Sequence, residues 1–431
     1  MRTATRDEGV ERLTMTMPSR TEMNRSEAGQ SEAGASQPSQ GLSPTSAEER
    51  AALVEAVRDF ADARLAPFAN QRDADHEFPV DTLREAGQLG LGAICVREDV
   101  GGSGLSRLDA IAIYEELARG DIAVATYISI HNMVVGMIDA EGTDEQRRRW
   151  LPQLTDMAEL ASYCLTEPGA GSDAAAVATT AVRDGDDYVL SGTKQFISGA
   201  GTSAVYVVMA RTGLTDDGGV DPAKRGSRGM TAFVVPASAP GLSFGAEERK
   251  MGWHAQPTRA VVLDGVRVPA SDRLGEEGEG FGIAMRGLNG GRLGIAAASI
   301  GGAQFALERT VAYVKERATF GQPLATRQHV QFELADMETE LQAARALLER
   351  AAAKLDAKAP DAPVACAMAK RFATDAGFRV ADQALQLHGG YGYLHEYGIE
   401  RVVRDLRVHR ILEGSNEMMR MIVGRALLGE R

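Results

Sequence analysis

The spacing of apolar residues changes twice along the chain, and this change constrains the fold more than any other feature. Residues 46–160 carry apolar side chains at the three- and four-residue steps of amphipathic helices. Residues 161–275 instead contain short strand-like runs, such as 204–210 and 230–235, separated by Gly, Asp and Pro turn clusters. From residue 276 to residue 431 the helical spacing returns. Because strands and helices do not alternate, the pattern disfavours a doubly wound nucleotide-binding fold.

The chain is therefore predicted to be an α+β protein with three folded domains. We expect an N-terminal α-helical domain at residues 46–160, a middle antiparallel β-barrel domain at 161–275, and a C-terminal four-helix-bundle domain at 276–431. The apolar stripe expected to be buried in that bundle consists of Leu334, Met337, Leu341, Ala344, Leu348, Ala351 and Leu355.

The first 45 residues differ in composition from the rest. They are rich in Ser, Glu, Gly, Thr and Gln and nearly lack aromatic residues, which predicts a disordered extension. They contain no apolar segment of the kind that a secretory signal needs, and the early acids Asp7, Glu8 and Glu11 argue against a transit peptide. A cytoplasmic location in a bacterial cell is expected.

Composition excludes several classes of protein. The net charge of −13 argues against a nucleic-acid partner. No apolar run approaches the ~20 residues of a membrane span, so no membrane insertion is expected. The few, scattered cysteines Cys95, Cys164 and Cys366 indicate neither a disulfide framework nor a metal site.

A carboxylate near the C-terminus, Glu413, is a candidate general base. It follows the apolar pair Ile411 and Leu412 and precedes Gly414, and the next helix begins at once with N-capping residues. Burial at such a junction would raise its pKa and suit it to accept a proton. From this stretch alone, the simpler alternative of a glutamate that points to solvent is favoured.

A glycine-rich stretch at residues 164–173, with the sequence CLTEPGAGSD, could hold a ligand. Gly169, Gly171 and Ala174 match the dinucleotide fingerprint Gly-x-Gly-x-x-Gly/Ala. Glu167 and Pro168 interrupt the strand that this fingerprint needs, and a strand rather than a helix is expected after it. The glycines would still let the backbone approach a ligand. A tight turn without a ligand remains the alternative.

The same stretch closely resembles the signature of the acyl-CoA dehydrogenase family of flavoproteins. The stretches 194–201, 251–259, 286–292 and 407–417 extend the resemblance from about Ser46 to the C-terminus. The resemblance implies FAD as cofactor, α,β-dehydrogenation of a short branched acyl-CoA, transfer of electrons to electron-transfer flavoprotein, and a homotetramer. A dehydrogenase for short straight or 2-methylbutyryl chains and, less favoured, an acyl-CoA oxidase are the alternatives.

The resemblance also implies the residues that bind FAD. One side of the flavin would be lined by Tyr163, Cys164, Leu165, Thr166, Gly171 and Ser172, and the other by Phe196, Ile197 and Ser198. The pyrophosphate would be bound by Arg317, with Thr319, Phe320, Arg327 and Gln328 nearby. The FAD of a neighbouring subunit would be reached by Gln386, Leu387, His388, Gly389 and Gly390, although a structural role is expected for His388. The cap residues Ser415, Asn416 and Glu417 are also expected to touch FAD.

Acyl-CoA would contact a further set of residues: Ser172, Asn289, Gly290, Gly291, Arg292, Gly414 and Arg425. In the family, the glutamate at the position of Glu413 removes the α proton, while its backbone N–H and a ribityl hydroxyl of FAD stabilise the developing charge on the thioester oxygen. Some members place the base at the position occupied here by Gly291, which cannot titrate. The resemblance therefore favours Glu413 as the base.

Overall fold

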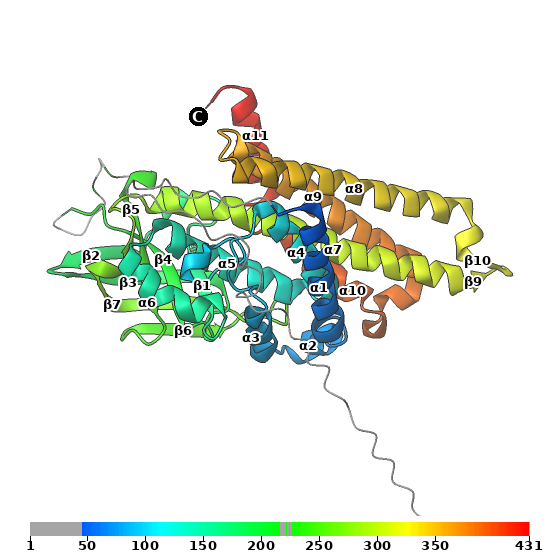
Figure 1. The fold of residues 1–431 in the computed structure, drawn as a ribbon, viewed down its shortest axis with the longest axis horizontal. Coiled ribbons are helices and arrows are strands. Elements are labelled where there is room, and N and C mark those ends of the chain that lie inside the picture. The colour runs from blue at the N-terminus through cyan, green and yellow to red at the C-terminus, as the bar shows by residue number, and fades with distance from the viewer. Residues whose placement is uncertain (1–44, 216–220, 222–223, 225, 431) are drawn as a thin grey trace, which may run out of the picture. The chain divides into compact units, whose positions relative to one another are not determined.

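The computed structural model describes residues 45–215, 221, 224 and 226–430, which belong to one compact unit (Figure 1). The predicted N-terminal extension lies outside these residues, apart from residue 45. The described chain consists of an α-helical part, a sheet and a second α-helical part, in that order. The predicted fold class is confirmed.

The N-terminal helices begin where the sequence places capping residues. The Ser46 hydroxyl accepts the backbone N–H of Glu49, and the Glu49 carboxylate accepts the backbone N–H of Ser46, which is the predicted start of α1. The helices of this part are α1 (Ala47–Phe60), α2 (Ala69–Asp75), α3 (Val80–Gln88), α4 (Arg107–Gly120), α5 (Ile122–Glu141) and α6 (Asp144–Thr155).

Helix α5 is more apolar than the sequence analysis recognised. Among the described residues it is the one helix long and apolar enough to cross a membrane by length and composition. However, 83% of its apolar window is buried inside the protein. Its apolar character is thus that of a core helix, packed on α4, α6, α7 and strand β1.

The sheet contains both predicted and unexpected strands. Its strands are β1 (Ala161–Cys164), β2 (Thr180–Asp184), β3 (Asp187–Ser198), β4 (Val205–Arg211), β5 (Met230–Pro236), β6 (Leu242–Glu247), β7 (Thr258–Pro269) and β8 (Arg273–Leu274). The order is β6-β7-β3-β2-β4-β5-β8, with β1 paired to β4. Most pairs are antiparallel, but β1 and β2 each run parallel to β4.

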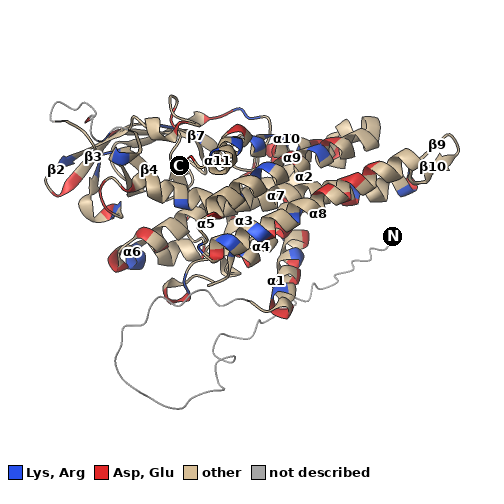
Figure 2. Ribbon diagram, turned by 90° about the horizontal axis from the view of Figure 1, so that it is seen from above, with Lys and Arg blue, Asp and Glu red and all other residues tan. Residues whose placement is uncertain are grey.

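Long helices form the C-terminal part. They are α7 (Gly280–Glu316), α8 (Gln328–Asp356), α9 (Ala362–His388), α10 (Ile399–Arg407) and α11 (Asn416–Leu427), with a small hairpin of β9 (Ala318–Thr319) and β10 (Gln322–Pro323) between α7 and α8. Of the predicted stripe on α8, Met337, Leu341, Ala344, Leu348 and Ala351 are buried. Charged residues of both signs occur along α1, α6 and α8 (Figure 2).

Helix α7 connects the sheet to the bundle. Near its start, Ile283, Ala284 and Leu288 share a hydrophobic cluster with Val207 of β4 and Val234 of β5. Its middle packs on α4, α8 and α9. The candidate site lies along this helix, where the sheet, α5 and the C-terminal helices meet.

Candidate active site

A cavity of about 820 Å³ lies where the sheet meets the helices. Many of the residues selected from the sequence line it: Tyr163, Leu165, Thr166, Gly171, Ser172, Phe196, Ile197, Ser198, Arg292, Glu413, Gly414 and Arg425. These residues come from distant parts of the chain. The fold therefore brings most of the predicted flavin-side residues together with the candidate base.

The walls of the cavity also contain residues that the sequence analysis did not select. They are mostly apolar. They include Trp253 in the loop before β7, Ile130 and Met133 of α5, four residues of α7 (Phe281, Met285, Leu288 and Ile295), and Met418, Met419 and Ile422 of α11. Trp253 lies in the stretch 251–259 that carried the family resemblance, so that match was the available signal. The others lie on apolar helix faces, where spacing alone does not distinguish a cavity wall from a packed core.

Glu413 is held in an unusual backbone conformation. Its φ is +53° and that of Gly414 is +85°, so two consecutive residues are left-handed, which is strained for a residue with a side chain. The turn follows a short 3₁₀ segment, Val408–Arg410, and precedes α11. Glu413 lines the cavity, and its Oε2 is buried without a hydrogen-bond partner in the described part of the chain.

The environment of Glu413 suits a general base. Burial raises the pKa of its carboxyl to about 7, while the nearby positive charges of Arg292 and Lys370 lower it. The neighbouring Tyr163 hydroxyl is buried, and burial, together with the charge of Glu413, raises its pKa. A carboxyl with a pKa near neutrality can accept a proton efficiently at physiological pH.

Gly291 on α7 makes room for this carboxyl. A Cβ atom at residue 291 would lie 2.9 Å from Oε2 of Glu413. The next residue, Arg292, is buried, donates from Nη1 to Oδ1 of Asn289 at 2.9 Å, and places Nε 3.4 Å from the backbone oxygen of Glu413. A side chain at residue 291 and the observed position of Glu413 are therefore incompatible.

Several predicted residues lie beside the cavity without lining it: Cys164, Asn289, Gly290, Gly291, Ser415, Asn416 and Glu417. The Cys164 side chain packs in a hydrophobic cluster of the sheet. The Asn416 side chain is buried against α9, where its amide donates to Thr374 and Asp375, and Glu417 is exposed. The Ser415 hydroxyl accepts the backbone N–H of Met418 and caps α11.

The wall of the cavity is largely apolar, with a few buried polar atoms. Phe196 lies on its wall, is 63% exposed and has a backbone φ of +59°. The Tyr163 hydroxyl and Trp253 Nε1 are buried and lack hydrogen-bond partners among the described residues. Apolar walls with a few unpaired polar atoms are typical of cofactor sites, so these residues fit the isoalloxazine ring of FAD.

The remaining predicted FAD residues lie at the far end of the bundle, near the β9–β10 hairpin (Figure 1). They are Arg317, Thr319, Phe320, Arg327, Gln328, Gln386, Leu387, His388, Gly389 and Gly390, none of which lines the cavity. Phe320 is 98% exposed, and Arg317 stands 5.3 Å from the ring centroid of Tyr391. One chain does not bring these residues to its own cavity.

The His388 side chain packs within the end of the helical bundle. It is buried, its Nδ1 lies 2.8 Å from the backbone oxygen of Ala384, and its ring stacks on Tyr313 with 4.3 Å between centroids. Burial lowers its pKa, so the neutral form is favoured.

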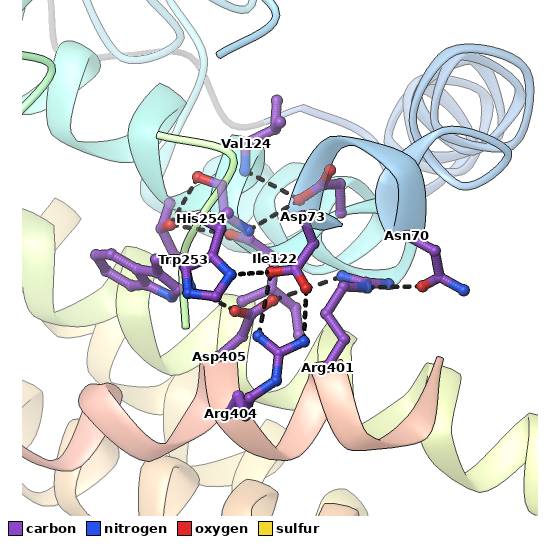
Figure 3. Close-up of polar contacts among 12 residues, drawn as sticks. Asn70, Asp73, Ile122, Val124, Trp253, His254, Arg401, Arg404 and Asp405 are labelled. Carbon is purple, nitrogen blue, oxygen red and sulfur yellow. Dashed lines mark hydrogen bonds and ion pairs between the residues drawn. The ribbon is translucent and has the colours of Figure 1, made fainter. Parts of the chain in front are cut away.

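A polar cluster fixes the loop that carries Trp253 (Figure 3). The Asp405 carboxylate of α10 accepts the backbone N–H of Trp253 at 2.6 Å. Asp73 of α2 pairs with His254 at 3.1 Å and with Arg404 of α10 at 2.5 Å. Burial raises the pKa of Asp405 to about 7. One wall of the cavity is thereby attached to the helix that leads into Glu413.

Comparisons with known proteins identify the class of protein to which this site belongs. Family models match the chain in succession: acyl-CoA dehydrogenase N-terminal domain at residues 47–158, middle domain at 162–266 and C-terminal domain at 278–428. The chain belongs to the acyl-CoA dehydrogenase family, and it is an oxidoreductase with FAD as cofactor.

Individual relatives are similar over nearly the whole chain. The mitochondrial isobutyryl-CoA dehydrogenase of Dictyostelium discoideum is 53% identical, over 90% of this chain and 91% of the relative. That of Bos taurus is 50% identical, over 91% of each. The structure of butyryl-CoA dehydrogenase from Megasphaera elsdenii superposes with a TM-score of 0.84 at 39% identity, covering 88% of this chain and 98% of that one.

Proposed function

We propose that the protein catalyses the α,β-dehydrogenation of a short branched acyl-CoA, with isobutyryl-CoA as substrate and methacrylyl-CoA as product, as in valine catabolism. The observation that carries the chemistry is that Glu413 lines a cavity suited to a flavin and that its Oε2 is buried without a hydrogen-bond partner among the described residues. The preference for isobutyryl-CoA is supported by the relatives named above.

In the proposed reaction, the Glu413 carboxylate removes the α proton of the thioester and becomes neutral. Bound FAD would supply the acceptor for the hydride that leaves the β carbon, so that two C–H bonds break and one C=C bond forms. Negative charge develops on the thioester oxygen during proton removal, and we expect the backbone N–H of Glu413 to stabilise it. A preorganised donor of this kind contributes ~3–4 kcal/mol. Arg292 holds the backbone of the base from α7.

Residues on the cavity wall would hold the isoalloxazine ring, with Phe196 on one side and Tyr163, Leu165 and Thr166 on the other. Acyl-CoA would enter past Ser172 and Arg425, both of which are exposed and line the cavity. We propose that Arg317 and the segment 386–390 serve the FAD of a neighbouring subunit, since they lie away from their own cavity. A homotetramer, with electron-transfer flavoprotein as electron acceptor, fits this arrangement.

The compared isobutyryl-CoA dehydrogenases are mitochondrial, so they lend no support to the expected bacterial cytoplasmic location.

The test begins with the visible spectrum of the purified protein. We expect bound FAD, bleached under anaerobic conditions by isobutyryl-CoA. In Glu413→Gln, FAD should remain bound while bleaching and turnover fall by at least ~10³-fold, because the amide cannot accept the proton. A protein that binds no FAD, or a Glu413→Gln variant with near-normal turnover, contradicts the proposal.

Substrate preference needs a separate measurement, because a methylene group in an apolar pocket is worth only ~1–3 kcal/mol. We expect kcat/KM to be highest for isobutyryl-CoA when it is compared with butyryl-CoA and 2-methylbutyryl-CoA. A straight-chain optimum would refute the isobutyryl assignment and leave the dehydrogenase assignment standing. Hydrogen peroxide formed without an added electron acceptor would indicate an oxidase instead.

A further inference from the structure

A buried lysine that the sequence analysis did not select contacts the loop of the candidate base. Lys370 lies on α9 and its side chain is fully buried. Its Nζ donates to the backbone oxygen of Gly414 at 2.8 Å and to Oδ1 of Asn416 at 3.0 Å. Neither acceptor is a carboxylate, although a buried ammonium group is costly unless well paired. The lysine is therefore placed against the loop that follows Glu413.

This loop needs support because of its backbone conformation. Glu413 and Gly414 both have positive φ. Their successive carbonyl oxygens face cations from different helices: Arg292 of α7 at the oxygen of Glu413 and Lys370 of α9 at the oxygen of Gly414. Strained backbone of this kind persists only where its surroundings over-determine it.

The charge of Lys370 also acts on the base. Lys370 is one of the two cations that lower the pKa of Glu413 against the effect of burial, the other being Arg292. Burial lowers the pKa of Lys370 itself to about 7, while Glu413, Asp375 and Glu417 raise it. Both members of this pair therefore titrate near neutrality and depend on each other.

The other ionisable groups around the pair are few. Arg292 of α7 lowers the pKa of Lys370, and Tyr163 of β1 faces Glu413. His409, in the 3₁₀ segment before the loop, is buried, and both burial and Lys370 lower its pKa to about 3, so it stays neutral. Lys370 and Arg292 are thus the cations that set the charge environment of Glu413 within the described chain.

We propose that Lys370 is a positioning residue for the base: its ammonium group fixes the main chain at Gly414, directs Glu413 into the cavity and favours the ionised carboxylate. This inference rests on the proposed role of Glu413. It predicts that a neutral residue at position 370 shifts the acidic limb of the pH profile to higher pH, whereas a residue that is merely structural would lower the rate without moving that limb.

The experiment measures kcat/KM for isobutyryl-CoA against pH in the FAD-loaded full chain and in Lys370→Met and Lys370→Arg. In Lys370→Met the apparent pKa of the acidic limb should rise by about one unit. At pH values below that pKa, kcat/KM should therefore be about tenfold lower than in the unmodified protein. Lys370→Arg keeps the charge and should keep the limb within about 0.3 unit of the original. If Lys370→Met does not fold, Lys370→Gln, which is also neutral and retains an amide donor, carries the same comparison.

A matched control is available at Lys250. This lysine is also held by main chain, since its Nζ donates to the backbone oxygen of Gln256 at 2.5 Å, but the acids that affect its pKa are Glu247, Glu248 and Asp405. Lys250→Met should leave the position of the acidic limb unchanged, whatever happens to the rate. An unmoved limb in the folded neutral variants of Lys370 overturns the inference.

Thermal unfolding gives a readout that does not depend on turnover. Because the pKa of Lys370 is lower in the folded state, the unfolded chain binds more protons between about pH 7 and pH 10.5, so Lys370 adds stability as pH rises through this range. That contribution should be absent in Lys370→Met.

If Glu413→Gln keeps turnover, the proposed function fails. If Glu413→Gln is inactive and the limb does not move in Lys370→Met, only the role of Lys370 fails.

Discussion

At the scale of single residues, the proposed reaction depends on a small space between Glu413 and Gly291. The sequence showed a glutamate after apolar residues and a glycine where some relatives carry the base. It could not show that the glycine gives room to the glutamate, because the two are far apart in the chain. In the structure a Cβ at residue 291 would lie 2.9 Å from Oε2 of Glu413. The missing side chain at residue 291 thus leaves room for the Glu413 carboxyl.

We expect Gly291→Ala to disable the base without unfolding the protein. The added methyl group must displace the Glu413 carboxyl, so kcat should fall by at least about tenfold, while alanine in a helix interior is favoured over glycine by ~1 kcal/mol. The measurement is steady-state kcat together with FAD content. Gly282→Ala is the matched control on α7, since its Cβ would meet only the flexible tip of Arg286. Equal activity in both variants would contradict the geometry.

The pH dependence follows from the same residue. Because burial raises the pKa of Glu413 to about 7, and only the ionised form accepts a proton, kcat/KM should rise with pH across neutrality and level off above it. A profile between pH 5.5 and pH 9 tests this. A limb near pH 4.5, the ordinary value for glutamate, would mean that the carboxyl is solvated.

At the scale of helices and strands, the longest periodic segments were predictable and the shortest were not. The stripe on α8 repeats over many turns, so its buried face was evident. Strand β1 spans only Ala161–Cys164 and runs directly into the glycine-rich stretch, which leaves too few residues for alternation. Strand β6 is half exposed along its length, so it lacks the apolar run that marked β4 and β5.

Substitutions on α8 should separate its two faces. Leu341 is fully buried, so Leu341→Ala should lower the free energy of unfolding by about 2–5 kcal/mol through lost packing and a residual cavity. Gln342, the next residue, is exposed, so Gln342→Ala should change the free energy of unfolding by less than about 0.5 kcal/mol. Thermal unfolding midpoints of both variants provide the test, and similar midpoints would place the stripe outside the core.

At the scale of the whole molecule, the residues predicted for FAD separate into two groups. Tyr163, Phe196 and their neighbours line the cavity, whereas Arg317 and the segment 386–390 lie by the β9–β10 hairpin at the far end of the bundle. The resemblance to the acyl-CoA dehydrogenase family implied both groups. Spacing along the chain could not show that one subunit keeps them apart.

If the far group serves a neighbouring subunit, Arg317→Ala should weaken FAD retention without loss of the fold. A charge-assisted hydrogen bond is worth ~1.5–3 kcal/mol, so FAD binding should weaken by about tenfold or more. The ratio of FAD to protein after gel filtration, measured together with the molar mass, provides the test. Arg267→Ala is the control, since the ion pairs of this exposed arginine within the described residues are with Asp184 and Asp187 of the sheet. Unchanged FAD content in Arg317→Ala would remove the far group from the site.

The polar cluster around Asp73 has a consequence for co-translational folding. Asp73 binds Arg404, which lies 331 residues later in the chain. Chains emerge from their N-terminal end, and early segments generally fold first. The contact between Asp73 and Arg404 therefore cannot form until almost all of the chain has been synthesised. The same holds for the hydrogen bond from the Trp253 loop to Asp405. Nascent chains that stop before α10 lack Arg404 and Asp405, so we expect the Trp253 loop to take up its position only when synthesis is nearly complete.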